Sequence, residues 1–153
     1  MTIITTREAR KEDMETLLAF EQGVIEAERP FDSSLKEGKI NYYNLEEMIF
    51  AENVHLIVAM AEEEIVGSGY LRIEKSRSYR KNEQNGYIGF MYVKPNFRGQ
   101  RISSLILESL KSWAKSKELK ELRLDVYKDN LGAIKSYERF GFHKSLINMK
   151  MEI

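Results

Sequence analysis

Apolar residues recur along the chain at two spacings, which predict helices in some segments and strands in others. Helical spacing marks residues 13–28, 102–117 and 131–140, and a capping pattern at Asn44 predicts a further short helix. Alternating or continuous apolar runs instead predict strands. The predicted strands cover residues 2–6, 55–60, 65–73, 86–93, 121–126 and 142–153.

The order of these elements predicts a mixed α/β fold, with a central twisted sheet of about six to seven strands flanked by about four helices. Strand 86–93, helix 102–117 and strand 121–126 form a βαβ unit, whose strands should be parallel and joined by a right-handed crossover. The chain has 153 residues, only two prolines and no linker-like or repeated segment, so we expect one domain over residues 1–153.

Composition argues against several classes of function. Lys plus Arg and Asp plus Glu both number 24, so the chain lacks the basic excess typical of nucleic-acid binding. It has no cysteine, which excludes disulfides, a Cys nucleophile and Cys-bound metal centres. Its two histidines lie far apart in sequence, which argues against a His-based metal site. No apolar run is long enough to span a membrane and no signal sequence is evident, so we expect a cytoplasmic protein.

The segment 93–104 has the features of an anion site. A strand ends there, a loop containing Gly99 follows, and a strongly amphipathic helix begins. Backbone N–H groups at a helix N-terminus lack partners inside the helix, and the helix dipole adds positive charge, so this turn suits a pyrophosphate. Further charges and hydroxyl donors come from Arg98, Arg101, Ser103 and Ser104. On these features alone, a plain turn with solvated arginines is equally well supported.

A second group of polar and aromatic residues follows strand 121–126. Asn130 stands where the strand gives way to a helix, and its plain structural role there is that of an N-cap. Tyr137 lies one helical turn after Ala133 and one before Gly141. Its plain role is core packing, and its phenol needs a polar partner if it is buried.

Together the two segments resemble the GNAT superfamily of acetyl-CoA-dependent N-acetyltransferases. The run from Arg98 to Ser103 is similar to that family's pyrophosphate loop, [QR]-x-x-G-x-[GA]. The run from Asn130 to Phe142 is similar to its N-x-x-A-x-x-x-Y-x-x-x-G-F segment, and the element order matches across essentially the whole chain. Arg101 stands where the loop usually has Gly, so its side chain must contact the pyrophosphate or point away from it.

The resemblance implies acetyl-CoA as co-substrate and a sheet splayed between strands 86–93 and 121–126, where the co-substrate enters. Backbone groups of strand 86–93 would hold the pantetheine arm, the amides of residues 98–104 would hold the pyrophosphate, and Asn130 would hydrogen-bond the pantetheine. The implied acetyl-CoA-binding residues are Met91, Tyr92, Val93, Arg98, Gly99, Gln100, Arg101, Ile102, Ser103, Ser104 and Asn130.

The implied activity is transfer of the acetyl group to a primary amine by direct attack in a ternary complex. Tyr137 would act as the general acid that protonates the leaving thiolate. The alternative is a non-catalytic acyl-CoA-binding sensor or regulatory module. The general base stays open, because strand 86–93 holds no carboxylate, and a water relay or bulk solvent is an equal alternative to a side chain. The side-chain candidates are Glu28, Glu83, His55 and Asp125.

We expect the acceptor amine near residues 28–32 and the loop 74–85, where Glu28 and Asp32 would suit a cation. Five aromatic residues are candidates for an aromatic wall of this site, and a role as core aromatics is at least as well supported for each: Tyr42, Tyr43, Tyr70, Tyr79 and Phe90. A basic cluster is by default a solvated run of charge, and its alternative role is to meet the acceptor or the CoA 3′-phosphate; its members are Arg72, Lys75, Arg77, Arg80 and Lys81. The apolar tail from Leu146 to Ile153 is compatible with a homodimer.

Overall fold

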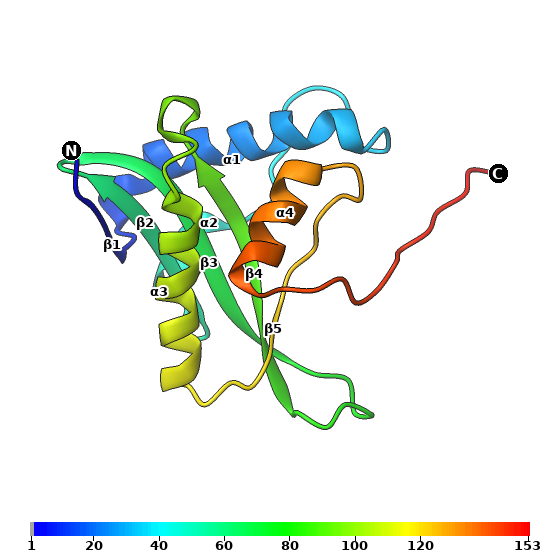
Figure 1. The fold of residues 1–153 in the computed structure, drawn as a ribbon. Coiled ribbons are helices and arrows are strands. Elements are labelled where there is room, and N and C mark those ends of the chain that lie inside the picture. The colour runs from blue at the N-terminus through cyan, green and yellow to red at the C-terminus, as the bar shows by residue number, and fades with distance from the viewer. Residues whose placement is uncertain (1) are drawn as a thin grey trace.

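A five-stranded sheet with helices on both faces forms the body of the computed structural model, which describes residues 2–153 (Figure 1). The strands lie side by side in chain order: β1 (Ile4–Glu8), β2 (Val54–Ala61), β3 (Glu64–Lys75), β4 (Gln84–Val93) and β5 (Leu122–Arg123). Neighbours are antiparallel except β4 and β5, which are parallel as predicted. The helices are α1 (Met14–Glu28), α2 (Leu45–Phe50), α3 (Ile102–Ser116) and α4 (Leu131–Phe140). The predicted mixed α/β fold is therefore confirmed.

Each face of the sheet has its own apolar core. On one face α3 packs through Ile106, Leu107 and Leu110, all fully buried, and α4 adds partly buried aromatic rings. On the other face α1 and α2 cover a layer rich in aromatic residues. The pyrophosphate turn leads into α3, which covers the first face, and α1, which covers the second, leads into the loop of residues 29–44.

The contact between α1 and β4 is unusually close, and it depends on Gly23. The ring of Tyr92 lies against α1 at this position and 4.8 Å from the ring of Phe20. A Cβ added to Gly23 would come within 2.6 Å of the Tyr92 ring, so a larger residue here would require the ring or the helix to move. Gly23 thus allows the Tyr92 ring to pack directly against α1.

Two strand predictions need correction. The predicted strand 121–126 pairs with β4 only at Leu122 and Arg123, after which the chain leaves the ladder. The predicted strand 142–153 is wrong: this segment has no regular structure and extends away from the body (Figure 1). A strand needs a neighbouring strand for its backbone hydrogen bonds, and none lies beside this segment within residues 2–153. The sheet described therefore has five strands rather than six to seven.

Candidate active site

The parallel pair β4 and β5 separates early, which leaves one edge of β4 open. Their pairing covers only Gly86 with Leu122 and Tyr87 with Arg123. Farther along β4, Phe90 has a positive φ of 55°, and the register against β3 shifts between Ser68 and Tyr70. This irregularity bends β4 away from the line of β5. The backbone of Met91, Tyr92 and Val93 lies beyond the separation, where an extended ligand can align with the strand.

At the end of β4 the chain makes a tight turn that presents free amides. Gly99 has a φ of 81° and Arg101 lies in the left-handed region at φ 61° and ψ 26°, so the backbone curls before α3 begins at Ile102. The amides of residues 99–104 donate to no acceptor within residues 2–153. Adjacent unpaired amides at the N-terminus of a 15-residue helix form a site for an anion.

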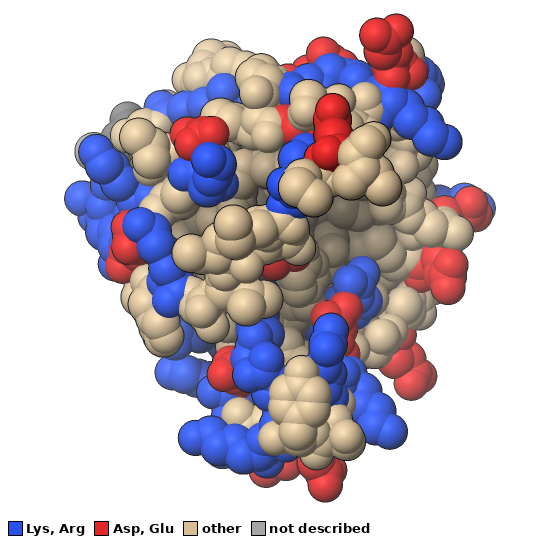
Figure 2. Space-filling model, turned by 90° about the vertical axis from the view of Figure 1, so that its right-hand side faces the viewer, with Lys and Arg blue, Asp and Glu red and all other residues tan. Residues whose placement is uncertain are grey.

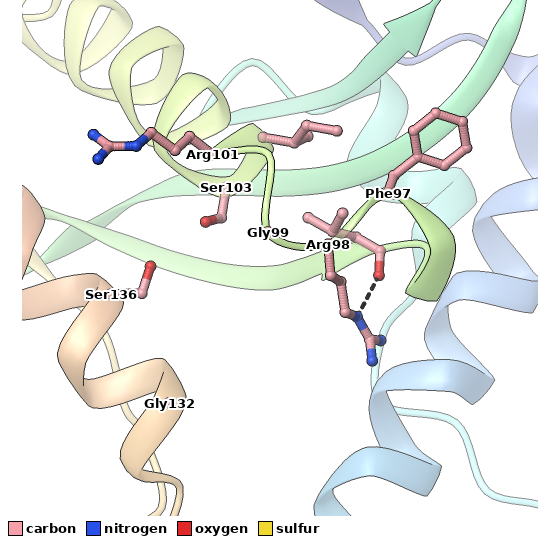
Figure 3. A pocket seen from close by; sticks show the side chains of 9 residues that line it. Phe97, Arg98, Gly99, Arg101, Ser103, Gly132 and Ser136 are labelled. Carbon is pink, nitrogen blue, oxygen red and sulfur yellow. Dashed lines mark hydrogen bonds between the residues drawn. The ribbon is translucent and has the colours of Figure 1, made fainter.

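A hollow of about 420 Å³ opens between this turn and α4 (Figure 3). From the expected acetyl-CoA-binding set it is lined by Val93, Arg98, Gly99, Arg101, Ile102 and Ser103, with Phe97 beside them. The sequence reasoning missed Gly132 and Ser136, which line the opposite wall. Their spacing of four residues puts both on one face of α4, and this pair of small residues at helical spacing was the available signal. The hollow does not reach Met91, Tyr92, Gln100, Ser104, Asn130 or Tyr137.

The two arginines of the turn point in different directions (Figure 3). Arg98 folds back: its Nε donates to the carbonyl of Val93 at 3.0 Å, and its guanidinium lies 5.7 Å from the ring centre of Tyr92. Arg101 is exposed and its guanidinium extends away from Gly99 and Arg98. The side chain that replaces the usual glycine therefore leaves the amides of the turn accessible.

Asn130 and Tyr137 both stand on α4, one at its start and the other in its last turns. The Oδ1 of Asn130 accepts from the amide of Ala133 at 3.3 Å, so Asn130 is the N-cap of α4, and its Nδ2 donates to no acceptor within residues 2–153. Burial, with a smaller contribution from the charge of Glu28, raises the pKa of Tyr137 to about 12. The phenol is thus protonated at neutral pH and lies within electrostatic reach of Glu28.

A family model described as the acetyltransferase (GNAT) family matches residues 13–142. The chain belongs to the GNAT acetyltransferase family. A search of curated proteins gave no match.

Solved structures share the fold of this GNAT protein at low sequence identity. A tetramutant of the BH1408 protein from Bacillus halodurans has 22% identity and a TM-score of 0.86, covering 97% of this chain and 99% of its own. A predicted acetyltransferase with acetyl-CoA from Clostridium acetobutylicum has 18% identity and a TM-score of 0.71, covering 98% and 96%. Glucosamine-6-phosphate N-acetyltransferase from Arabidopsis thaliana has 20% identity and a TM-score of 0.70, covering 98% of both chains.

Acidic groups of the GNAT chain gather where α1 ends. Asp32 accepts from the hydroxyl of Tyr127 at 2.6 Å, from the amide of Ser34 at 3.0 Å and from Nζ of Lys150 at 3.4 Å, and it also bonds the Ser34 hydroxyl. The hydroxyls of Ser34 and Tyr127 hold the pKa of Asp32 well below its usual range. Burial raises the pKa of the half-buried Glu28, and the charge of Asp32 adds to that effect.

Most of the expected aromatic wall assembles beside these carboxylates. The ring of Tyr43 packs edge-on against Tyr70 at 5.8 Å and lies 5.0 Å from Phe90. Tyr42 stacks edge-on against Tyr43 at 5.7 Å. Tyr79 does not join them, because it lies in the β3–β4 loop with 71% of its surface exposed. Burial raises the pKa of Tyr43 far above that of a free phenol, so the wall stays uncharged.

A buried carboxylate that the sequence reasoning missed holds this wall in place. Glu21 on α1 is fully buried, and its Oε2 accepts from the amides of Tyr42 and Tyr43, each at 2.7 Å. Its Oε1 is buried without a hydrogen-bond partner within residues 2–153. Glu21 therefore fixes the segment that leads into α2 against α1.

The remaining candidate bases lie in different environments. His55 on β2 stacks on Trp113 at 4.9 Å, on the face covered by α3, away from Tyr42 and Tyr43. Glu83 is exposed in the β3–β4 loop. Asp125 accepts from the hydroxyl of Tyr87 at 3.1 Å, just after β5. Of the four candidates, Glu28 is the one whose charge acts on the pKa of Tyr137.

The predicted basic cluster divides between two places. Arg72 forms a salt bridge with Glu74 at 2.7 Å and lies over the ring of Tyr87. The other members surround the β3–β4 loop, where Lys and Arg gather at the lower end of the face in Figure 2. The β3–β4 loop lies at one end of β4 and the pyrophosphate turn lies at the other end. At about 3.3 Å per residue, the strand separates the loop from the turn by roughly 30 Å. The loop is therefore too far from the turn to meet a CoA phosphate bound there.

None of the helices within residues 2–153 combines the length and apolar character needed to cross a membrane. The same residues contain no group of three or more His, Asp or Glu side chains placed to hold a metal ion.

Proposed function

We propose that residues 1–153 form one N-acetyltransferase domain, which moves an acetyl group from acetyl-CoA to a primary amine. The observation that carries the proposal is the open row of amides at residues 99–104, placed beside the hollow that separates the turn from α4. Membership in the GNAT acetyltransferase family supports the same chemistry. In this proposal the amides, together with Ser103 and Ser104, hold the pyrophosphate of acetyl-CoA.

The pantetheine arm is proposed to follow the open edge of β4. The backbone of Met91, Tyr92 and Val93 would pair with its amides as an added strand would, and Nδ2 of Asn130 would hydrogen-bond it from the other side. Asn130 has this donor to spare because only its Oδ1 is used to cap α4. The thioester would then lie near the bulge at Phe90, where a backbone N–H of Met91 or Tyr92 stabilises the oxyanion.

Transfer requires one bond to form and one to break. The neutral amine nitrogen attacks the thioester carbon, and the carbon–sulfur bond breaks as the tetrahedral intermediate collapses. Tyr137 donates its phenolic proton to the departing thiolate, and the new amide nitrogen loses its extra proton. With its pKa raised to about 12, Tyr137 is protonated at neutral pH and can serve as this acid. Holding both substrates together supplies a large part of the acceleration.

The acceptor is proposed to bind between α1 and the loop after β5. Glu28 and Asp32 provide negative charge there, and the tyrosine wall provides apolar and cation-binding surface. Glu28 is the proposed group that receives the proton from the amine, directly or through water. A cationic small-molecule amine fits this side, and one related fold is that of a glucosamine-6-phosphate N-acetyltransferase.

The test is steady-state release of free CoA thiol from acetyl-CoA across a panel of primary amines. Turnover with at least one amine, lowered strongly by Tyr137→Phe at unchanged CoA affinity, supports the proposal. Binding of acetyl-CoA by calorimetry with no turnover on any amine would favour the non-catalytic sensor. Failure of acetyl-CoA to bind or to raise the melting temperature would overturn both functions.

A further inference from the structure

The hydroxyl of Tyr42 is a buried polar group without a partner. It is closed off from solvent, and it neither donates nor accepts a hydrogen bond within residues 2–153. Such a hydroxyl lowers the stability of a protein, because it loses its hydrogen bonds to water and gains none in return. Packing alone therefore favours phenylalanine at this position. A polar group of a ligand would supply the partner that the chain does not.

The backbone of Tyr42 is held against α1, which restricts where its side chain can lie. Its amide donates to Oε2 of the buried Glu21 at 2.7 Å. Two residues earlier, the carbonyl of Ile40 accepts from Nε2 of Gln22 at 2.9 Å. The ring of Tyr42 meets the ring of Tyr43 edge-on, with 5.7 Å between their centres. The unpartnered hydroxyl is thus carried by a residue that is fixed at its backbone and at its ring.

This hydroxyl lies beside the carboxylate of Glu28, the last residue of α1. Burial raises the pKa of Glu28, and the hydroxyl of Tyr42 opposes that rise. Burial also raises the pKa of Tyr42, and Glu28 adds to that effect. The charge of Glu28 acts as well on Tyr137, the proposed general acid. The hydroxyl and the carboxylate therefore flank the place where the acceptor nitrogen is proposed to react.

A neutral primary amine has the hydrogen-bonding groups that this pair of acceptors requires. It carries two N–H groups and one lone pair. If one N–H donates to Glu28 and the other to the hydroxyl oxygen of Tyr42, the lone pair is free to point at the thioester carbon. The hydroxyl hydrogen can at the same time donate to Glu28. A secondary amine has a single N–H, so it leaves one of the two acceptors unpaired.

We propose that Tyr42 is a specificity residue for the acceptor: its hydroxyl accepts one N–H of the amine while Glu28 accepts the other, so that the enzyme selects primary over secondary amines. This inference rests on the proposed acetyl transfer. Tyr42 keeps its own proton throughout, and Glu28 receives the proton that the new amide nitrogen loses. The acceptor has to displace part of the chain around the buried hydroxyl, and residues 32–44 beside it contain neither helix nor strand.

The test compares kcat/KM for a primary amine and for its N-methyl derivative, measured as release of CoA thiol. We expect the unaltered enzyme to prefer the primary amine at least about tenfold. Tyr42→Phe should lower kcat/KM for the primary amine about tenfold and leave that for the N-methyl amine within a factor of about two. Tyr43→Phe, which removes a hydroxyl from the neighbouring ring, is the control and should keep the original preference.

Thermal unfolding separates this role from a structural one. Because the hydroxyl of Tyr42 has no partner in the chain, Tyr42→Phe should melt at the same temperature as the unaltered enzyme or above it. A lower melting temperature together with an unchanged preference for the primary amine would assign the hydroxyl to the fold and overturn the inference.

The pH dependence of kcat/KM provides a further readout. Glu28 must be ionised to accept a proton, so activity is lost as the pH falls through its pKa. Tyr42→Phe removes a group that lowers this pKa, so the acidic limb of the profile should move to higher pH, and it should stay in place in Tyr43→Phe. The other charged or titratable groups nearby are Arg29, Asp32, Tyr43, Tyr127 and Tyr137. Burial keeps these tyrosines neutral, and Asp32 ionises at lower pH.

The outcomes distinguish this inference from the proposed function. No release of CoA with any amine would overturn both. Turnover with the same ratio of primary to N-methyl amine in the unaltered enzyme and in Tyr42→Phe, or an acidic limb that does not move, would overturn the role of Tyr42 and leave acetyl transfer standing.

Discussion

Tyr127 donates its hydroxyl hydrogen to Asp32 across 2.6 Å, and this bond joins segments 95 residues apart. It ties the end of α1 to the loop that leads from β5 to α4. The hydroxyl of Ser34 and, to a smaller extent, this bond from Tyr127 lower the pKa of Asp32, because hydrogen bonds to the charged form favour it. The two sides of the proposed acceptor site are thus linked through a negative charge.

Asp32→Asn should therefore weaken binding of the amine substrate and leave binding of acetyl-CoA unchanged. A hydrogen-bonded charge contributes about 1.5–3 kcal/mol, so we expect KM for a cationic amine to rise about tenfold or more. KM for acetyl-CoA should stay within a factor of two or so, since Asp32 is not among the residues that line the hollow at the pyrophosphate turn. Asp129→Asn, an exposed carboxylate on the loop that carries Tyr127, serves as the control. Equal changes in both KM values would contradict a role in acceptor binding.

Tyr137→Phe should lower kcat by at least about 10²-fold, the lower range for general acid catalysis, and leave the Kd for CoA unchanged. The phenol is protonated below its pKa, and that pKa is raised to about 12. The kcat of the unaltered enzyme should then show no alkaline decline near pH 10, the ordinary phenol pKa. A decline at that pH that disappears in the Phe variant would show that burial does not shift this group.

Asn130 offers a way to separate capping from ligand binding. Asn130→Ala removes both functions and should cost about 1 kcal/mol of unfolding free energy as well as CoA affinity. Asn130→Asp keeps the oxygen that accepts from Ala133 but loses the Nδ2 donor, so it should restore stability without restoring affinity. Denaturant unfolding and calorimetry measure the two separately.

Asn44 provides the matched control for that experiment, because its Oδ1 caps α2 by accepting from the amide of Glu47 at 3.2 Å. Asn44→Ala should lower stability by a similar amount and leave CoA binding unchanged. Full CoA affinity in Asn130→Asp would restrict Asn130 to its structural role.

Two glycines line the hollow, and replacing each of them by alanine should change the stability of the protein in opposite directions. A Cβ at either Gly99 or Gly132 meets no atom within 4 Å, so space does not distinguish them. Gly99 has a φ of 81°, and Gly99→Ala should destabilise the protein by about 1–2 kcal/mol. Gly132 lies in α4, and Gly132→Ala should stabilise it by up to about 1 kcal/mol. Thermal unfolding gives both values, and two shifts of the same sign would contradict this account.

Local signals in the sequence identified the elements of the proposed acetyl-CoA side. The apolar stripe of residues 102–117 predicted α3, and the two asparagines before apolar runs predicted their caps correctly. Gly99 and the arginines beside it marked the turn because a helix N-terminus is recognisable within a few residues. These features depend on neighbours in sequence, which is why one chain is enough to find them.

The acceptor side could not be predicted to the same degree. The hydrogen bonds between Glu21 and Tyr42 and between Asp32 and Tyr127 join segments that are distant in sequence. No local sequence pattern predicts such bonds. Alternation after Arg123 predicted a longer β5, but Leu124 obtains its burial by packing on the core below the sheet without ladder bonds. An alternating pattern indicates which side chains of a segment are buried. It does not indicate which other strand forms backbone hydrogen bonds with that segment.

The close fit of Tyr92 against Gly23 has a mechanical consequence. The Tyr92 ring lies directly against the backbone of α1 at Gly23, so a shift of α1 along β4 would require this ring to move as well. Amines of different sizes would then be accommodated by the segment of residues 31–43, whose hydrogen-bond partners include Glu21, Gln22, Arg29 and Tyr127. Selectivity for the acceptor would depend on the length and stiffness of that one segment, while the acetyl donor would bind to the closely packed pair of α1 and β4.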